Sequence, residues 1–372
     1  MVKKFLVIGQ TPPPYHGQSM MIKRLVDGEF SKIKIYHIRT VFSSSIEDIG
    51  KPSFFKIFHL LEIITKTYYY RLKHRPTVLV YYPITNSSSG ILKDNIFLFL
   101  TRWLFKDIVF YFRSAGLIDF LETKSDLVRN VLTFSLMKPS LSILLTKSNP
   151  RDDLVLKSKQ VEFIPNGIED ISLKFPDLKH TRIRLDVFNC LYIGLITKGK
   201  GIFDLIEAFR ILTDQFSIYQ VKLNVVGKFD SFETEQAALN LISSYQLDNN
   251  ISFMGQQTGE DKWDQFRRAD VLCFPTFYEN ESFGNVILEG FMCSLPVIGT
   301  DWRGISEIID HNVNGLIVPI QSPMNLAQAI LKVYQDEGAR KTFARNARSK
   351  YETYYTLQKH LDQIEETLVN LH

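Results

Sequence analysis

Short apolar runs alternate with helix-like stretches along almost the whole chain, and the alternation restarts once. The first set of runs comprises Lys4–Gly9, Val78–Tyr82, Ile108–Arg113, Leu141–Thr146 and Val161–Pro165. The second set comprises Cys190–Gly194, Lys222–Gly227, Ile251–Gly255, Val271–Pro275 and Pro296–Thr300. Short runs that are apolar throughout are typical of strands buried on both faces of a parallel sheet. The pattern therefore predicts an α/β protein with two Rossmann-like, doubly wound domains.

A turn and a polar stretch mark the expected domain boundary. The dipeptide Asn166–Gly167 is a turn signal, and polar sequence follows it to about His180. With 372 residues, the chain exceeds the length at which a single hydrophobic core keeps growing. We place the N-terminal domain at residues 1–170 and the C-terminal domain at residues 171–350. Residues 351–372 are expected to form a final helix.

Cysteine content and hydropathy restrict the compartment. The three cysteines, Cys190, Cys273 and Cys293, are an odd number without the spacing of metal ligands, so a reduced, cytoplasmic setting is expected. The sequence has no run of about 18 uncharged apolar residues. Its first apolar run of five residues is too short for a signal peptide.

The net charge of +4 conceals an asymmetry between the two halves. Residues 1–170 carry 24 Lys and Arg against 15 Asp and Glu, whereas residues 171–372 carry 20 against 25. The basic half indicates an anionic partner, and nucleic acid is a poor candidate because a base-stacking motif and a dense basic helix are both missing. Within residues 54–75, Phe54, Phe58, Leu61, Ile64 and Tyr68 share one helical face. Such a basic amphipathic helix suits an anionic membrane surface, although packing on the N-terminal sheet explains it equally well.

The segment 274–319, FPTFYENESFGNVILEGFMCSLPVIGTDWRGISEIIDHNVNGLIVP, contains the main candidate site. Glu281 and Glu289 lie eight positions apart around a Ser-Phe-Gly-Asn turn. A predicted strand precedes the turn and a helix follows it, and a helix N-terminus with a nearby Gly284 suits a phosphate group. The alternative is an ordinary strand-turn-helix unit with solvated acids.

This segment resembles the signature of the retaining nucleotide-sugar glycosyltransferases with a Glu-x7-Glu motif, the family 4 type with the GT-B fold. Three further segments match in order: GQTPPPYHGQS at 9–19, IPNGIED at 164–170 and YIGLITKGKGIFDLIEAF at 192–209. The first loop is similar to that of a bacterial polysaccharide-biosynthesis subgroup. The resemblance implies two lobes facing each other across a cleft, with the last helix returning to the N-terminal lobe.

The resemblance also implies roles for individual residues. Glu281 would bind the donor sugar or diphosphate, and Glu289 the ribose hydroxyls. Lys200 would neutralise the leaving diphosphate, with Lys198 and Arg113 as further cations. The donor-binding set is completed by Gly17, Gly194 and the backbone amides of Phe283, Gly284 and Asn285. No Asp-x-Asp pair occurs in the sequence, so we expect no metal and no cofactor other than the nucleotide sugar.

The sequence departs from the family pattern at several positions. Leu195 stands where Arg is frequent, and Arg113 where His is frequent. Ser282 replaces the usual glycine after the first motif Glu, and Arg303-Gly304 replaces a Gly-Gly pair. These changes put the usual donor contacts of positions 113 and 195 in doubt.

The expected activity is transfer of a hexosyl group, with retention, from a nucleotide-diphosphate sugar to a lipid-linked saccharide. The context would be O-antigen or capsule synthesis, with the enzyme peripheral on the inner face of the cell membrane. One alternative is a soluble enzyme that glycosylates a small cytosolic acceptor. The other is a non-catalytic nucleotide-sugar-binding relative.

Overall fold

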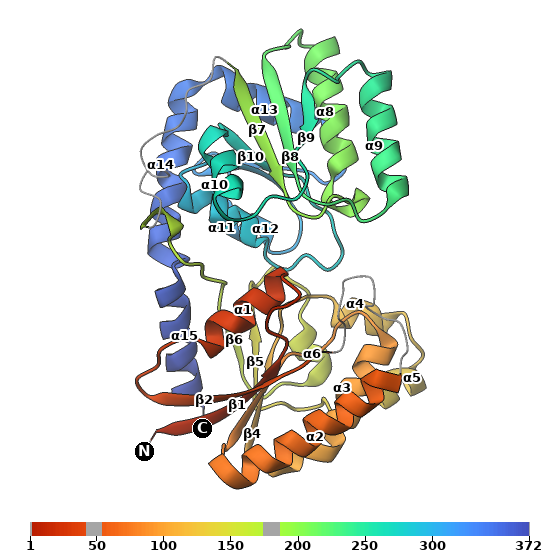
Figure 1. The fold of residues 1–372 in the computed structure, drawn as a ribbon, viewed down its shortest axis with the longest axis vertical. Coiled ribbons are helices and arrows are strands. Elements are labelled where there is room, and N and C mark those ends of the chain that lie inside the picture. Colours follow the sequence, from red (N-terminus) through yellow and green to blue (C-terminus); the bar gives the residue numbers. More distant parts are fainter. Residues whose placement is uncertain (1, 42–53, 174–186, 372) are drawn as a thin grey trace. The chain divides into compact units, whose positions relative to one another are not determined.

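A computed structural model describes residues 2–41, 54–173 and 187–371 (Figure 1). The chain divides into two compact units. Unit 1 comprises residues 1–166 and 357–372, and unit 2 comprises residues 167–356. The division thus falls at 166 and 356, against 170 and 350 in the sequence-based prediction.

Unit 1 is built on a parallel sheet of six strands in the order β2-β1-β3-β4-β5-β6. Its central strands are fully buried because both faces of the sheet are covered by helices. The strands are β1 (Lys3–Gly9), β2 (Ile33–Arg39), β3 (Val78–Tyr81), β4 (Asp107–Tyr111), β5 (Leu141–Leu144) and β6 (Val161–Phe163).

Two helical layers cover this sheet. One layer packs on Leu6, Leu79 and Phe110 and their neighbours. It contains α2 (Phe54–His74), α3 (Ser88–Thr101), the short helix η2 (Arg102–Leu104), α4 (Leu117–Glu122), α5 (Asp126–Thr133) and α6 (Asp152–Leu156). The chain reverses direction across the sheet after β2, so right-handed crossovers place α1 (Gly17–Val26) on the opposite face. Helix α15 (Leu357–Val369) also packs in unit 1, with Leu361 against Gly28.

Unit 2 repeats the design with a parallel sheet in the order β12-β11-β10-β7-β8-β9. The strands are β7 (Phe188–Ile193), β8 (Val221–Val226), β9 (Ile251–Phe253), β10 (Val271–Phe274), β11 (Val297–Thr300) and β12 (Gly315–Val318). One face packs against α8 (Ile202–Asp214), α9 (Phe232–Ser244) and α13 (Pro323–Gln335). The other carries α11 (Asn285–Met292) and α12 (Ile305–Ile308), which contact Leu272, Phe274 and Gly299. The remaining elements are η3 (Ile171–Leu173), η4 (Lys198–Lys200), α10 (Gly259–Arg268) and α14 (Glu337–Tyr354).

The predicted fold class is confirmed, since both sheets are Rossmann-like. All ten predicted strands form, but β2 and β12 were not predicted. Both are edge strands, and β2 is only half-buried. The predicted final helix is interrupted, because α14 ends at Tyr354 and Thr356 makes a β-bridge with Ile168 before α15 begins.

Candidate donor-binding site

The predicted site residues of unit 2 gather where β7 and β10 end. These strands are neighbours and parallel, so the segments that follow them leave the sheet at the same edge. The segment after β7 forms η4, and the segment after β10 forms the turn that contains Glu281. The Phe277 amide donates to the Gly199 carbonyl at 2.8 Å, which joins the two segments.

Lys200 and Glu281 form an ion pair at this edge. The Lys200 ammonium also lies over two aromatic rings, 5.5 Å from the centroid of Phe274 and 5.1 Å from that of Tyr278. The two charged side chains keep 19% and 12% of their surface exposed, so both are partly shielded yet open to a ligand. A shielded ammonium of this kind is suited to an anionic group.

The position of Lys200 depends on the glycine that follows it. Gly201 has φ +78°, and a Cβ at this position would lie 2.1 Å from the Pro275 carbonyl oxygen. Thr197 caps the start of η4 by accepting from the Gly199 amide. Lys198, also in η4, has an exposed side chain. The turn is therefore held against the end of β10, with Lys200 directed toward Glu281 and Lys198 toward solvent.

The backbone is open at Gly194, directly after β7. Gly194 has φ +146°, and a Cβ there would meet nothing within 4 Å. The next side chain, Leu195, is exposed, and its carbonyl accepts from the Tyr192 hydroxyl at 2.8 Å. Burial, and then the negative charge of Glu281, raise the pKa of Tyr192, so this hydroxyl stays a donor. A ligand can approach the Gly194 backbone closely.

Helix α11 carries the second motif carboxylate. Gly284 precedes it with φ +73°, and an added Cβ would lie 2.8 Å from the Phe274 ring. The Phe283 side chain is in the core, 6.1 Å from the Tyr355 ring between centroids. The Phe283 side chain is therefore used for packing, and the ligand contacts expected of the Phe283, Gly284 and Asn285 amides stay predictions.

Sequence reasoning missed the partner of Glu289. Lys262 of α10 lies 2.7 Å from the Glu289 carboxylate, and both side chains are about four-fifths buried. Lys262 follows two acids on a polar helix, which in the sequence is typical of a solvated surface. Only the packing of α10 beside α11 identifies it. Each of the two motif carboxylates is thus paired with a lysine, Glu281 with Lys200 and Glu289 with Lys262.

The other two predicted residues belong to unit 1. Arg113 is buried, donates to the side-chain oxygen of Asn166, and lies 3.8 Å from the Tyr111 ring centroid. Gly17 is the exposed first residue of α1, whose N-cap is His16. Because these residues lie in a different unit from Lys200, their place in a common site stays a prediction.

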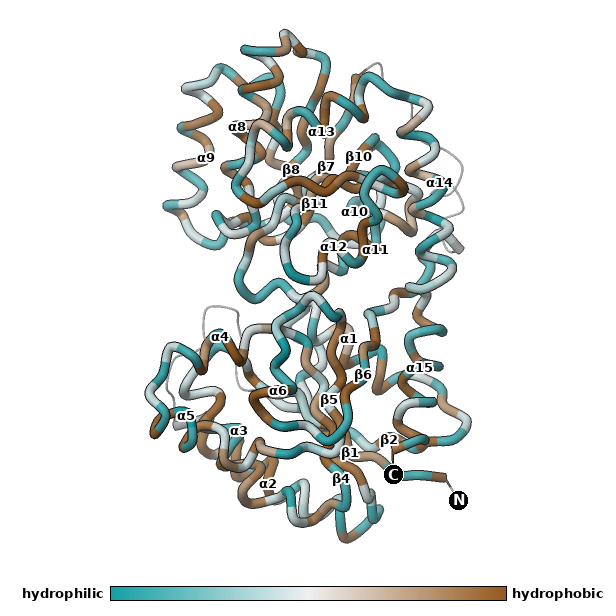
Figure 2. Tube along the Cα trace, turned by 180° about the vertical axis from the view of Figure 1, so that it is seen from behind, coloured by the Kyte–Doolittle hydropathy of each residue, from teal (hydrophilic) through white to brown (hydrophobic). Residues whose placement is uncertain are grey.

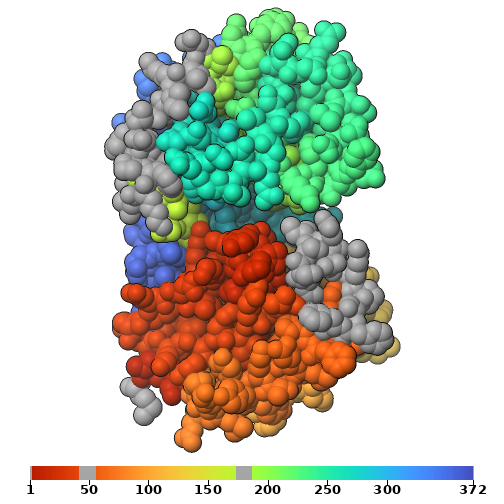
Figure 3. Space-filling view, viewed as in Figure 1, coloured from red at the N-terminus to blue at the C-terminus, as the bar shows by residue number. Residues whose placement is uncertain are grey.

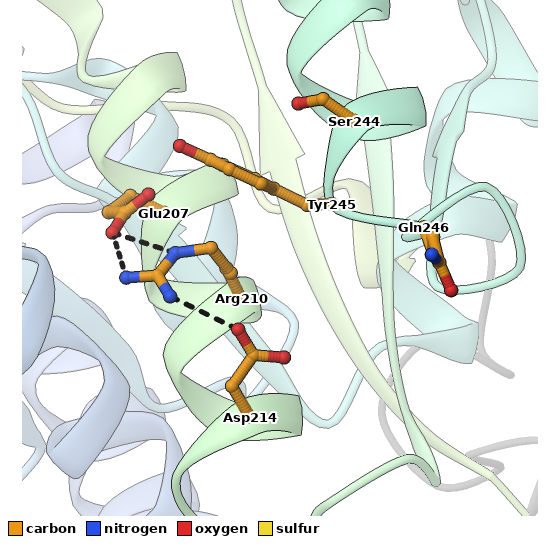
Figure 4. Close-up of a pocket in the computed structure, with 6 residues that line it drawn as sticks. All are labelled: Glu207, Arg210, Asp214, Ser244, Tyr245 and Gln246. Carbon is orange, nitrogen blue, oxygen red and sulfur yellow. Dashed lines mark hydrogen bonds and ion pairs between the residues drawn. The ribbon is translucent and has the colours of Figure 1, made fainter.

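A separate cavity of about 520 Å³ lies between the ends of α8 and α9 (Figure 4). Arg210 occupies it and binds Glu207 at 2.5 Å and Asp214 at 3.1 Å. The charges are thus mutually satisfied, and the cavity contains none of the predicted site residues. Within residues 2–41, 54–173 and 187–371, no group of three or more His, Cys, Asp or Glu side chains is placed to hold a metal ion.

This chain is similar in sequence to several known glycosyltransferases. Residues 177–350 match the family model described as glycosyl transferases group 1. The capsular polysaccharide biosynthesis glycosyltransferase CapM of Staphylococcus aureus is 30% identical over 187 residues, which cover 50% of this chain and 47% of CapM. The D-rhamnosyltransferase WbpZ of Pseudomonas aeruginosa is 25% identical, covering 68% of each chain. The N-acetyl-alpha-D-glucosaminyl L-malate synthase of Bacillus anthracis is 23% identical, covering 64% of this chain and 61% of the synthase.

Solved structures show the same architecture over the whole chain. Anabaena HepE in complex with UDP superposes with a TM-score of 0.69 at 18% identity, covering 98% of this chain and 99% of HepE. The protein therefore has the GT-B fold. The alignment with CapM spans about half of the length of CapM and half of this chain.

Proposed function

We propose that this protein is a glycosyltransferase that takes a hexosyl group from a nucleotide-diphosphate sugar. The observation that carries the proposal is the Lys200–Glu281 pair at the edge of the unit 2 sheet, beside the start of α11. The match of residues 177–350 to group 1 glycosyl transferases and the UDP bound to HepE support it.

The chemistry follows from the charge that develops in the reaction. When the anomeric C–O bond breaks, negative charge builds on the departing diphosphate. Lys200 and the amides at the start of α11 stabilise this charge, and such stabilisation is greatest in the transition state. Glu281 is paired with Lys200 in the structure. Donor binding would let Lys200 turn to the diphosphate and leave Glu281 to accept from the sugar hydroxyls.

The second carboxylate is proposed to hold the ribose. Glu289 has one oxygen bonded to Lys262, and a carboxylate can accept several further hydrogen bonds. Lys262 orients the carboxylate while the ribose hydroxyls donate to it. Retention of configuration is part of the proposal through the Glu-x7-Glu resemblance. Metal-free catalysis is proposed because Lys200 and the helix start supply the positive charge.

The acceptor we propose is a lipid-linked saccharide, used in cell-surface polysaccharide synthesis at the inner face of the membrane. The similarity to CapM, a glycosyltransferase of capsular polysaccharide biosynthesis, supports this class. A second candidate is a small soluble acceptor, which the similarity to the L-malate synthase favours. Acceptor competition between a lipid-linked saccharide and a soluble hydroxy acid distinguishes them.

The first experiment is a binding screen with UDP-, GDP- and ADP-sugars by thermal shift, followed by calorimetry. Glu289→Ala should weaken binding of the active donor by about 1.5–3 kcal/mol, the range for a hydrogen bond to a charged group. Glu233→Ala, an exposed acid on α9, is the matched control and should bind as the wild type does. Equal affinity in Glu289→Ala and the wild type would refute the ribose assignment.

Turnover of the active donor should also survive EDTA. A complete loss of activity on chelation, restored by a divalent metal, would reject the metal-free mechanism. Nuclear magnetic resonance of the product then determines its anomeric configuration. An inverted product would overturn the proposal of retention without affecting the donor site.

A further inference from the structure

Helix α3 has an outer surface that is apolar where a soluble protein would ordinarily be polar. Its inner residues Ile91, Phe97 and Leu98 are buried against the sheet. Its outward residues Leu92, Ile96, Phe99 and Leu100 recur at helical spacing and are exposed, Phe99 by 60%. A helix that covers a sheet normally has a charged or polar outer face. Both faces of α3 are therefore apolar.

The neighbouring elements extend this surface. Trp103 of η2 is 67% exposed, and its ring lies edge-on to Tyr68 of α2 at 5.8 Å. On the other side, Phe134 follows α5 and contacts Phe99 edge-on at 5.5 Å between ring centroids. The Asn95 side chain donates to the Val131 carbonyl of α5, which ties these two helices together.

We call this surface the outer helical face. Its central residues are all exposed and apolar: Ile96, Phe99, Leu100, Trp103, Val131 and Phe134. Phe58, Leu61 and Leu72 of α2 are also exposed. The helices α2, α3 and α5 lie in one layer of unit 1, and hydrophobic stretches are visible along them (Figures 1 and 2). In the space-filling view, the orange atoms of α2 and α3 form part of the surface of unit 1 (Figure 3).

Positive charge borders the outer helical face. Residues 54–75, 88–106 and 117–138, which form and flank this layer, contain eleven Lys and Arg against five Asp and Glu. One of these acids, Asp94, is buried and bound to Tyr81. Arg71 donates to the Leu104 carbonyl, and Arg102 to the carbonyls of Ser135 and Met137, so both cations lie close to Trp103. Lys106 and Lys138 are exposed.

The positive charge around the outer helical face favours a bilayer over a second copy of the protein as the partner that covers this face. In a two-fold dimer built on this face, the same basic residues would face each other and repel. An anionic bilayer instead attracts each Lys and Arg, and long cationic side chains can reach its headgroups while their neighbours enter the apolar region. Tryptophan and tyrosine are the residues that favour this boundary. No helix in the described ranges is long and apolar enough to cross a membrane, so contact would be in the plane of the surface.

We propose that the outer helical face of unit 1 docks on a bilayer that contains anionic phospholipids. This proposal rests on the proposed function, because a lipid-linked acceptor is presented at such a surface. It differs from the expectation drawn from the sequence. That expectation placed Phe54, Phe58, Leu61, Ile64 and Tyr68 of residues 54–75 on the membrane, whereas the structure adds α3, Trp103 and α5. The Phe54 side chain lies outside the described residues, and Ile64 and Tyr68 are half-buried.

The test is flotation of the full chain with vesicles of phosphatidylcholine, alone or mixed with phosphatidylglycerol. The wild type should float with the mixed vesicles, less so at high salt, and hardly at all with phosphatidylcholine alone. The double variant Ile96→Glu/Phe99→Glu should lose at least about tenfold in partitioning, since it removes two apolar side chains that would enter the bilayer. Lys106→Glu/Lys138→Glu should lose binding to the mixed vesicles.

The matched control is Leu239→Glu, an apolar residue on α9 of unit 2 that is 42% exposed, close to the 44% of Ile96. It should float as the wild type does. All variants should keep the thermal shift given by the nucleotide sugar, so a failure of docking is distinguishable from a failure of the proposed function. Absence of wild-type flotation, or equal flotation of Ile96→Glu/Phe99→Glu, would overturn the proposal. So would a lipid-free dimer of the wild type, seen by sedimentation, that this double variant dissociates.

Discussion

Two glycines of unit 2 give a matched pair for testing the turn that positions Lys200. Gly201 and Gly255 both have left-handed backbone, with φ +78° and +66°. An added Cβ at Gly201 would lie 2.1 Å from the Pro275 carbonyl oxygen, whereas one at Gly255 would have nothing within 4 Å. Alanine at either position therefore tests backbone strain, and at Gly201 it also tests contact with β10.

The expected magnitudes follow from these distances. An L-residue in the left-handed region costs roughly 1–2 kcal/mol, and this is the whole effect expected for Gly255→Ala. At Gly201 the backbone must also shift by about 1 Å to relieve the overlap, and overpacking of this kind costs roughly 1–3 kcal/mol more. We expect Gly201→Ala to lower the free energy of unfolding of unit 2 by about 3 kcal/mol and Gly255→Ala by about 1 kcal/mol.

Urea unfolding followed by tryptophan fluorescence measures both values. The chain has three tryptophans, of which Trp263 and Trp302 lie in unit 2 and Trp103 in unit 1. A Trp103→Phe background therefore makes the fluorescence report on unit 2 alone. Equal losses for Gly201→Ala and Gly255→Ala would refute the reasoning, because the Pro275 carbonyl would then be out of reach of position 201.

Two further predictions concern charge. Lys200→Ala should reduce turnover by about two orders of magnitude, or roughly 3 kcal/mol of barrier. Lys198→Ala and Arg113→Ala should cause smaller losses, and Leu195→Arg should partly rescue Lys200→Ala. Near-normal turnover of Lys200→Ala in steady-state assays would show that the diphosphate is held elsewhere. Burial first, then Arg113, lowers the pKa of His360 to about 3, and this side chain bonds the Pro165 carbonyl at 2.6 Å. Because the unfolded chain binds the proton below about pH 6.5 and the folded chain does not, stability should fall as the pH drops from there toward 3, by about 2 kcal/mol at pH 5. His360→Gln should remove that share of the loss in urea unfolding followed at Trp103 in a Trp263→Phe/Trp302→Phe background, and an unchanged pH dependence would contradict the prediction.

The strands show how far periodicity alone reaches. Segments such as FLVIG and VLVY are apolar at every position, and only burial on both faces of a parallel sheet satisfies such a run, so the sequence determined the central strands and the fold class. Strand β2, IKIYHIR, alternates apolar and polar residues because it lies at an edge where one side is open. Strand β12 is four residues long at the other sheet's edge. The alternation weakens the hydrophobic signal of β2, whereas β12 is apolar throughout and was missed although its sequence, GLIV, is as apolar as the VLVY of β3.

For the candidate site, too, the sequence determined some features and the tertiary structure decided others. The motifs in the sequence determined that Glu281, Glu289, Gly284 and Lys200 belong to one ordered set. The contact between Lys200 and Glu281, 81 positions apart, was decided by the pairing of β7 with β10, which brings their following turns to one edge. Lys262 has no local signal, because a lysine on a polar helix is indistinguishable from a solvated one until α10 is packed beside Glu289.

The part of the outer helical face that α3 contributes was decided by tertiary structure alone. The sequence of α3, SSGILKDNIFLFLT, has apolar residues on all sides and is typical of a buried helix. Its rotation about its own axis is determined by the sheet, which takes Ile91, Phe97 and Leu98 and leaves Ile96, Phe99 and Leu100 outside. Composition determined that this helix is hydrophobic, but only packing determines which of its side chains face solvent, because burial depends on contacts between segments that are distant in the chain.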